Sequence, residues 1–140
     1  VFFLFIFFQI TPYHYAYLNL FNGKYENAHK KFENDYWGAS IKELIRISSF
    51  DKNKLVNFST CGINLHIAKF YLKKQGYSKF QFVNYDNSDY IIMTNRVVSI
   101  NDKIDNSNNL GSCYDKYKGN NVYEVKRNGL SLSLIRKKTN

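Results

Sequence analysis

The chain has 140 residues, and 20 Lys and Arg against 11 Asp and Glu give it a formal net charge of +9. Its length fits one domain, and a composition that is 44% hydrophobic and 18% aromatic can fill a core, which excludes a wholly disordered basic tail. With 7 Gly, 1 Pro and 2 Cys, collagen-like and disulfide-dense classes are excluded as well.

The first residues, Val1 to Phe8, form an unbroken apolar run. A helix of that length spans roughly 12 Å, whereas a bilayer core is about 30 Å thick and needs about 20 residues. We interpret residues 1–10 as the C-terminal end of a transmembrane helix, with a signal peptide or a buried strand as alternatives. The interpretation is supported by Tyr13, Tyr15 and Tyr17, which have the amphipathic character of a membrane-interface belt.

An aromatic connector over residues 11–39 is expected to lead into a folded domain over residues 40–140. Ser40 to Glu43 fits the capping-box pattern and predicts a helix over residues 41–49. The side chains expected to face inward from this helix are Ile41, Leu44, Ile45 and Ile47.

A strand, a helix and a second strand are predicted next. Leu55–Ser59 is interpreted as a short buried strand and Phe80–Tyr85 as another. The helix between them, over residues 65–75, has Asn64 as its N-cap and Gly76 as a left-handed terminator. Its apolar face is expected to contain Leu65, Ala68, Tyr71 and Leu72. This order resembles one βαβ unit.

Tyr90–Thr94 is continuously apolar, as expected of a strand buried on both faces, and residues 101–121 are interpreted as a long loop. Asn128-Gly129 predicts a hairpin between strands 122–127 and 130–136. Three leucines of the second strand are expected on one face, opposite two serines: Leu130, Leu132 and Leu134 against Ser131 and Ser133. The predicted fold class is a small α/β sandwich with a βαβ unit and a C-terminal antiparallel hairpin, preceded by the end of a transmembrane helix.

The remaining sequence features indicate no catalytic motif. Cys61 and Cys113 are compatible with a disulfide outside the cytoplasm or with two free thiols, and the sequence leaves both open. The three histidines, His14, His29 and His66, never reach ligand spacing with each other or with a cysteine, so no metal is expected.

The segment from Phe32 to Gly38 (FENDYWG) places the only Trp of the chain beside a Tyr and two carboxylates. Carboxylates next to aromatic rings can hold a sugar, through hydrogen bonds to hydroxyls and stacking on the ring. The alternative, favoured by the residues alone, is a structural plug: Trp37 packs against the first helix, and Glu33 and Asp35 are solvated or pair with Lys30-Lys31.

Two segments, Thr11–Asn19 (TPYHYAYLN) and Phe32–Glu43 (FENDYWGASIKE), resemble the region after the last membrane helix in bacterial and archaeal relatives of the dolichyl-phosphate-mannose–protein mannosyltransferases. These are polytopic glycosyltransferases of the GT-C superfamily. Their pattern is His-Pro-Tyr-Gln-Tyr-x-Tyr-x-Asn, a spacer containing glycine, then Phe-Glu-x-Asp-Tyr-Trp-Gly-x-Ser. Thr11 and His14 stand where the pattern has His and Gln. The matching residues are Pro12, Tyr13, Tyr15, Tyr17, Asn19, Gly23, Phe32, Glu33, Asp35, Tyr36, Trp37, Gly38 and Ser40.

Looser similarity at Asp89–Arg96 and Lys126–Leu130 extends this resemblance over nearly the whole chain. The resemblance implies hexosyl transfer from a polyprenyl-phosphate-linked sugar donor to an acceptor hydroxyl. It also implies a catalytic acidic residue in an early external loop that this chain lacks, so no residue here is assigned as catalytic and the chain alone is expected to be inactive. The residues implied as substrate-binding candidates are Tyr13, His14, Tyr15, Asn19, Glu33, Asp35, Tyr36 and Trp37.

In this interpretation the domain is extracytoplasmic (periplasmic), on a multi-pass protein of the cytoplasmic membrane, and binds no cofactor of its own. Its expected partners are membrane lipids, the transmembrane part of the same protein and the lipid-linked sugar. By the positive-inside rule, a net charge of +9 would favour a cytoplasmic location for the domain. That rule, however, counts charged residues near the end of the membrane helix, and none of the residues from Gln9 to Gly23 is Lys, Arg, Asp or Glu. The positive surface is expected to meet anionic lipid head groups.

Two alternatives come from other classes of protein. Twelve Tyr and twelve Phe with a Lys excess suit a nucleic-acid-binding module, and a secreted α/β interaction domain is the other alternative. No known binding motif organises the scattered Lys and Arg, so no nucleic-acid partner is expected.

Overall fold

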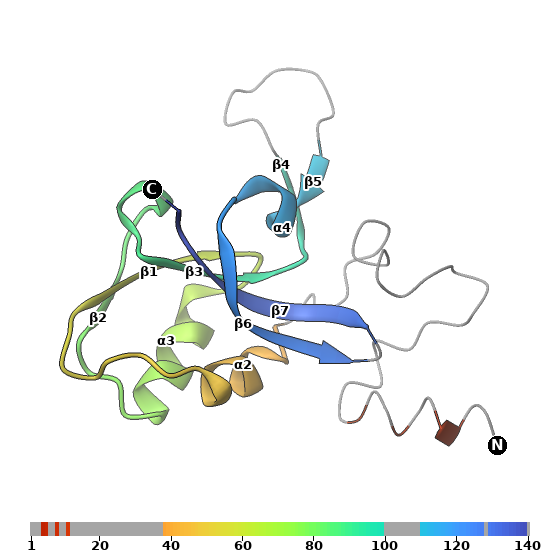
Figure 1. Cartoon of the computed structure of the whole chain (residues 1–140), viewed down its shortest axis with the longest axis horizontal. Coiled ribbons are helices and arrows are strands. Elements are labelled where there is room, and N and C mark those ends of the chain that lie inside the picture. Colours follow the sequence, from red (N-terminus) through yellow and green to blue (C-terminus); the bar gives the residue numbers. More distant parts are fainter. Residues whose placement is uncertain are drawn as a thin grey trace.

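The computed structural model describes Leu4, Phe5, Phe8, Thr11 and residues 38–99, 110–127 and 129–139. Their elements, in chain order, are α2 (Ile41–Ile47), β1 (Val56–Cys61), α3 (Leu65–Lys74), β2 (Phe80–Phe82), the 3₁₀ helix η4 (Tyr85–Asn87), β3 (Tyr90–Thr94), β4 (Val97–Ser99), β5 (Leu110–Ser112), α4 (Cys113–Lys116), β6 (Asn120–Arg127) and β7 (Leu130–Lys137). Five strands form one mixed sheet in the order β2-β1-β3-β7-β6, and β4 and β5 form a small second sheet. Figure 1 shows α2 and α3 on one side of the five-stranded sheet and α4 with β4 and β5 on the other. The predicted class, a small α/β domain ending in an antiparallel hairpin, is confirmed.

The predicted βαβ unit is β1-α3-β2, and β1 is parallel to both of its neighbours, β2 and β3. The main-chain N–H of His66 donates to Asn64 Oδ1 at 2.9 Å, so Asn64 caps α3 as predicted. Gly76, with φ of +86°, follows the helix in the left-handed conformation. Strand β2 ends at Phe82, three residues earlier than predicted, because the chain turns into η4.

Helix α2 departs from its predicted capping. Ser40 makes no side-chain cap; its hydroxyl instead donates to Ser133 Oγ of β7 at 2.5 Å. Glu43 is not free to complete a capping box, because both its carboxylate oxygens accept hydrogen bonds from Arg127 Nη2, at 2.7 and 2.8 Å. The helix ends at Ile47. The side chain of Ile47 was predicted to face inward, but the residue is 45% exposed. Tertiary partners have therefore replaced the local cap.

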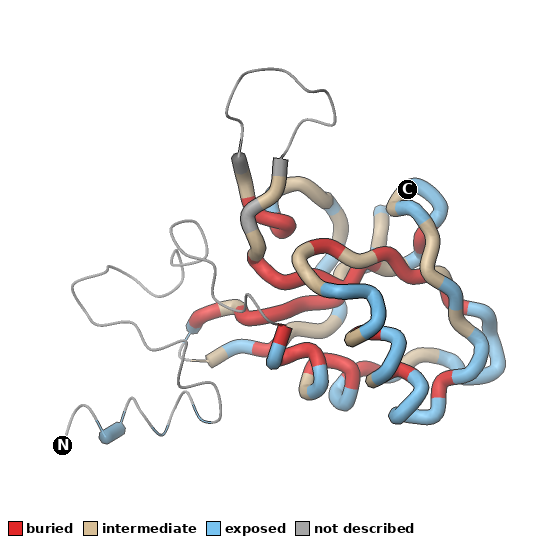
Figure 2. The backbone as a smooth tube through the Cα atoms, turned by 180° about the vertical axis from the view of Figure 1, so that it is seen from behind, coloured by how far each residue is buried: buried red, intermediate tan, exposed pale blue. Residues whose placement is uncertain are grey.

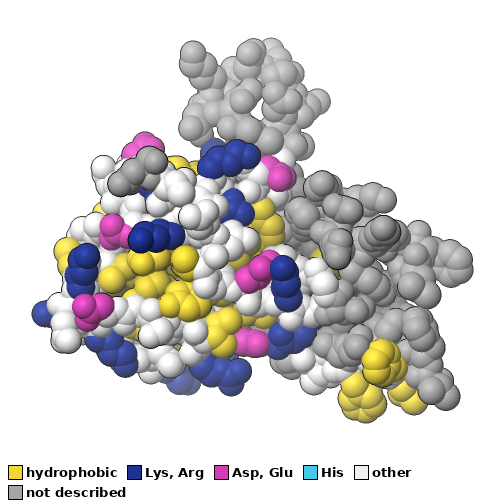
Figure 3. Space-filling model, in the orientation of Figure 1, with side chains coloured by type: hydrophobic (Ala, Val, Ile, Leu, Met, Phe, Trp, Pro, Cys, Tyr) yellow, Lys and Arg dark blue, Asp and Glu magenta, His cyan; other side chains and the backbone are white. Residues whose placement is uncertain are grey.

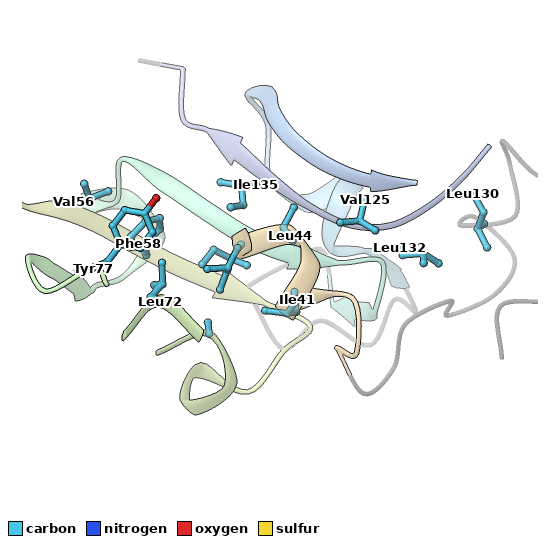
Figure 4. Close-up of a cluster of buried hydrophobic side chains, with 13 residues drawn as sticks. Ile41, Leu44, Val56, Phe58, Leu72, Tyr77, Val125, Leu130, Leu132 and Ile135 are labelled. Atoms are coloured by element: carbon cyan, nitrogen blue, oxygen red, sulfur yellow. The ribbon is translucent and has the colours of Figure 1, made fainter. Parts of the chain in front are cut away.

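The main core lies between α2, α3 and the sheet, as the close-up in Figure 4 shows. Ala68 and Leu72 of α3 are fully buried there, whereas Leu65, predicted on the same face, is 38% exposed. Figure 2 shows the same division, with buried residues in the strands and on the inner side of the helices. The buried members of this cluster are Ile41, Leu44, Ile45, Val56, Phe58, Ala68, Leu72, Tyr77, Ile92, Val125, Leu130, Leu132 and Ile135.

Strand β7 does not alternate as predicted. The pairing register with β6 shifts where Val125 faces Ser133 and Lys126 faces Ser131, so Leu132 is an extra residue on β7. Beyond this bulge the faces are exchanged: Ser133 lies on the helix side against Ser40, and Leu134 joins the cluster on the opposite face. The predicted grouping of Leu134 with the other two leucines is therefore wrong.

The opposite face of the sheet carries a smaller apolar cluster of Cys61, Ile91, Met93, Cys113, Tyr114 and Leu134. A disulfide joins Cys61 at the end of β1 to Cys113 at the start of α4, with 5.8 Å between their Cα atoms. Of the two alternatives that the sequence left open, the structure has the disulfide.

The predicted loop over residues 101–121 is wrong for its second half, where β5, α4 and the start of β6 lie. A second capping-box pattern in the sequence could have indicated the start of α4. Ser112 Oγ accepts a hydrogen bond from the main-chain N–H of Asp115, and the Asp115 carboxylate accepts one from the main-chain N–H of Ser112. The part of that loop over residues 101–109 lies outside the described residues.

No helix in the described part of the chain is long and apolar enough to cross a membrane. The helix end predicted over residues 1–10 falls largely outside the described residues, as does the connector up to residue 37. Gly38, the last residue of the FENDYWG segment, is described: it is buried with φ of +67°, and a Cβ there would lie 3.3 Å from Ile41 and Ile63 side-chain carbons. A glycine at this position thus has a structural reason.

Candidate functional site

The binding residues predicted from the sequence cannot be placed on this structure. All of them lie outside the described residues and stay predictions: Tyr13, His14, Tyr15, Asn19, Glu33, Asp35, Tyr36 and Trp37. The described part of the chain offers a different candidate.

The side of the sheet that carries α4 has a hollow where β6 and β7 meet that helix. Its volume is about 420 Å³, within the range of roughly 300–1,000 Å³ that is typical of small-molecule sites. We call it the Arg136 hollow; it is lined by Tyr114, Asp115, Asn121, Glu124, Lys126, Gly129, Ser131, Leu134 and Arg136.

Arg136 is held at the hollow by hydrogen bonds to three segments. Its Nε donates to Asn121 Oδ1 of β6 at 2.7 Å, and its Nη1 donates to the carbonyl oxygens of Tyr114, at 2.9 Å, and of Tyr117. The two carbonyls belong to the last turn of α4 and to its C-cap, where a cation is favoured by the free carbonyls of a helix end. The guanidinium thus links β6, β7 and α4.

Burial of the guanidinium lowers the pKa of Arg136, because a charged group is less stable away from water. The nearby side chains of Tyr114, Tyr85, Asp115 and Glu124 act in the opposite direction and favour the charged form. Arg136 therefore acts as a fixed, partly desolvated hydrogen-bond donor, and not as a proton acceptor.

The β6 side of the hollow carries one ion pair. Lys126 Nζ lies 3.1 Å from Glu124 Oε2, and the lysine side chain is 59% exposed against 21% for the glutamate. The two residues are two apart on one strand, so they project from the same face of the sheet. The pair leaves carboxylate and ammonium groups at the solvent side of the hollow.

Ser131 adds a buried hydroxyl on the β7 side. Its Oγ is out of contact with solvent and has no hydrogen-bond partner among the described residues. A buried hydroxyl without a partner is unfavourable, so such atoms often mark a place where something else binds. Asp115, in contrast, has its carboxylate engaged by Ser112, with Ser112 Oγ donating at 2.8 Å.

The charges of the hollow balance, because Lys126 and Arg136 stand against Asp115 and Glu124. Its lining therefore has both donors and acceptors without a surplus of either charge. This arrangement suits hydrogen bonding to a neutral ligand with several hydroxyls better than binding of a phosphate, which needs an excess of positive charge. The described residues contain no group of three His, Cys, Asp or Glu that could hold a metal ion.

This site was not predicted from the sequence, where Arg136 is one of the scattered Lys and Arg that no known binding motif organises. The pattern of alternation carried a usable signal: Arg136 follows the apolar Ile135 on a strand, so the two side chains point to opposite faces. The alternation of the strand could not indicate that α4 lies beside Arg136 and that its carbonyl oxygens accept hydrogen bonds from the guanidinium.

Comparison of the chain with known protein families, curated proteins and solved structures finds no match. The structure defines a small α/β domain, and its function has to be argued from the disulfide and from the sites themselves.

Proposed function

We propose that this chain is an extracytoplasmic domain of a polytopic membrane glycosyltransferase, related to the dolichyl-phosphate-mannose–protein mannosyltransferases. Such an enzyme transfers a hexose from a polyprenyl-phosphate-linked donor to an acceptor hydroxyl. The domain supplies binding surface and no catalytic group. Support comes from the sequence resemblance over residues 11–19 and 32–43, and from one feature of the fold that is independent of it.

That feature is the disulfide, and it is the observation that carries the proposal. Disulfides persist in the periplasm and outside the cell, whereas cytoplasmic thiols are kept reduced. Cys61 and Cys113 are 8% and 0% exposed, and they lie in the centre of the smaller apolar cluster. The disulfide therefore supports an oxidising compartment for the domain, which is where the proposed enzyme class works.

The Arg136 hollow gives the domain a place to contact a sugar. Hydroxyl groups both donate and accept hydrogen bonds, so they match a lining with Arg136 and Lys126 as donors and Glu124 as acceptor. The free hydroxyl of Ser131 adds a further partner. In the proposed function this hollow binds the acceptor or the sugar head group of the donor.

The compartment is tested by the state of the two cysteines in cells that express the complete parent protein. Because both sulfurs are buried, cells are quenched in acid, the protein is denatured, and free thiols are tagged with a polyethylene-glycol maleimide. We expect tagging of Cys61 and Cys113 only when reductant is added first. A Cys61→Ser variant is the matched control, since its Cys113 should be tagged without reduction. Tagging of both thiols in unreduced wild-type protein would contradict the extracytoplasmic proposal.

The sugar-binding role is tested by transfer assays in membranes that contain the complete enzyme. Glu124→Gln keeps the shape of the hollow and removes its charged acceptor, so we expect the KM for one substrate to rise about tenfold with kcat unchanged. Asp86→Asn, an exposed carboxylate on η4, is the matched control and should leave both constants unchanged. An unchanged KM in Glu124→Gln would remove the hollow from the proposal and leave the compartment result standing.

The FENDYWG segment remains a second proposed contact of the same enzyme, on the strength of the resemblance. Asp35→Asn and Trp37→Ala in the complete enzyme are each expected to lower transfer at least tenfold. If both variants keep full transfer activity, the segment does not bind substrate and has only the structural role described above as the alternative.

A further inference from the structure

The outer side of the α2–α3 layer carries a concentration of positive charge. Lys69, Lys73 and Lys74 of α3 are all exposed, as are Lys42 and Arg46 of α2. Figure 3 shows Lys and Arg side chains along the lower edge of the molecule, where α2 and α3 lie in Figure 1. Lys52 extends the patch past the end of α3, since its Nζ donates to the carbonyl oxygen of Gln75 at 3.2 Å.

Among the residues that the structure describes, acidic side chains are almost absent from this surface. Helix α3 has none, and the one carboxylate of α2, Glu43, is bound by Arg127. From Leu44 to Tyr85 the chain has seven Lys and Arg against a single acidic residue, Asp51, so this stretch carries +6 of the total net charge of +9. The stretch of chain that contains α3 is therefore clearly basic.

An aromatic ring stands in the middle of these cations. Phe70 is 58% exposed, and Lys74 Nζ lies 5.9 Å from the centroid of its ring. Residues three and four apart share one side of a helix, so Phe70 lies beside Lys73 and Lys74, with His66 on the preceding turn. Leu65, at the start of the helix, is 38% exposed.

We infer that this basic aromatic face, made of Lys42, Arg46, Lys69, Phe70, Lys73 and Lys74, binds the surface of an anionic phospholipid bilayer. Lysines near such a surface are attracted to its negative potential, and their long stems let the ammonium groups reach the head groups. Phe70 is placed to enter the boundary between head groups and acyl chains. The inference does not rest on the proposed glycosyltransferase, because it concerns the side of the sheet away from the Arg136 hollow.

The test uses the complete 140-residue chain in vesicle sedimentation. Vesicles of phosphatidylcholine are compared with vesicles that also contain phosphatidylglycerol. Leu4, Phe5 and Phe8 are exposed, and insertion of apolar side chains does not depend on lipid charge, so the quantity measured is the preference for phosphatidylglycerol. We expect a clear preference that weakens as salt is raised.

Two variants assign the preference to this face. Lys69→Gln/Lys73→Gln/Lys74→Gln should reduce it roughly 100-fold, since each lysine at an anionic surface contributes a factor of about five. Phe70→Ser should weaken binding to the anionic vesicles about tenfold and leave its salt dependence unchanged. All these side chains are exposed, so the variants are expected to fold, which circular dichroism checks.

The matched control removes three lysines near α4 and β6: Lys116→Gln/Lys118→Gln/Lys126→Gln. It loses the same charge as the α3 triple variant and should keep at least a third of the wild-type preference. The inference is overturned if the α3 variant prefers phosphatidylglycerol as wild type does, or if the control loses as much. It is also overturned if wild type shows no preference and instead binds a single-stranded oligonucleotide, which would favour a nucleic-acid partner.

Discussion

The two sides of the five-stranded sheet are stabilised in different ways. On the side of α2 and α3, a broad apolar cluster around Phe58 and Leu72 fills the space between helices and strands. On the side of α4 the apolar cluster is small, and the disulfide and the hydrogen bonds of Arg136 hold the elements in place. Apolar packing dominates the first side, where the buried hydrogen bond between Ser40 and Ser133 is added to it. On the second side, covalent and polar links hold the elements around an open hollow.

The two sides also differ in their charge. None of the six residues that make up the basic aromatic face is acidic, whereas the Arg136 hollow is lined by two cations and two carboxylates. A surface of the first kind suits a large anionic partner, and a hollow of the second kind suits a small neutral one. Stability measurements on matched variants can test how far this division holds.

The largest effect is expected from removing the disulfide. The two cysteines are 52 residues apart, and closing a loop of that length restricts the unfolded chain by about 4 kcal/mol. Reductant should therefore lower the free energy of unfolding by about that amount in urea titrations. Cys61→Ala/Cys113→Ala should unfold at the reduced midpoint whether or not reductant is present. Equal midpoints for oxidised and reduced wild type would show that the α4 side does not depend on this link.

On the helix side, Leu72→Ala is expected to lower the free energy of unfolding by about 3 kcal/mol, because it empties a fully buried site in the main core. Its control is Phe70→Ala on the same helix, whose exposed ring should change stability by no more than about 0.5 kcal/mol. Urea denaturation followed by circular dichroism measures both. Similar losses in the two variants would mean that the packing of α3 differs from that described.

Arg136→Met tests the polar links of the α4 side. The variant keeps an unbranched apolar stem and deprives the carbonyls of Tyr114 and Tyr117, and the amide of Asn121, of their donor. We expect a loss of about 2 kcal/mol in unfolding free energy. Lys137→Met, an exposed neighbour on the same strand, should be neutral. A neutral Arg136→Met would assign Arg136 to ligand binding alone.

The smallest effect separates two serines on β7. Ser131→Ala removes a buried hydroxyl without a partner among the described residues, so it should raise the free energy of unfolding by about 1 kcal/mol. Ser133→Ala breaks the hydrogen bond to Ser40 and should lower it by about the same amount. Thermal unfolding scans give both shifts. Destabilisation by Ser131→Ala would indicate that its hydroxyl has a structural partner.

Elements with purely local signals could be predicted from the sequence. Asn64 and Gly76 fixed both ends of α3, the apolar run fixed β3 to the residue, and the turn containing Gly129 fixed the hairpin. Each of these signals depends on the conformation of the residue itself or of its neighbours in the chain.

The missed features depend on distant partners. The cap expected at Ser40 is replaced by a contact 93 residues away, and the exchange of faces in β7 depends on how β6 pairs beside it. For the candidate site, the sequence contains Arg136 and Ser131 but not their convergence with α4, which the Cys61–Cys113 disulfide anchors. The spacing of residues along the chain does not show that these elements come together.

The position of this disulfide along the chain bears on the order in which the domain can assemble during synthesis. The bond encloses α3, β2 and β3 and ends at Cys113, whereas β6 and β7 follow it in the sequence. A chain that emerges amino end first can close this covalent ring before Leu130 has emerged. The β3 edge that pairs with β7 in the folded domain is then still unpaired, so an oxidising catalyst can act on a half-built sheet.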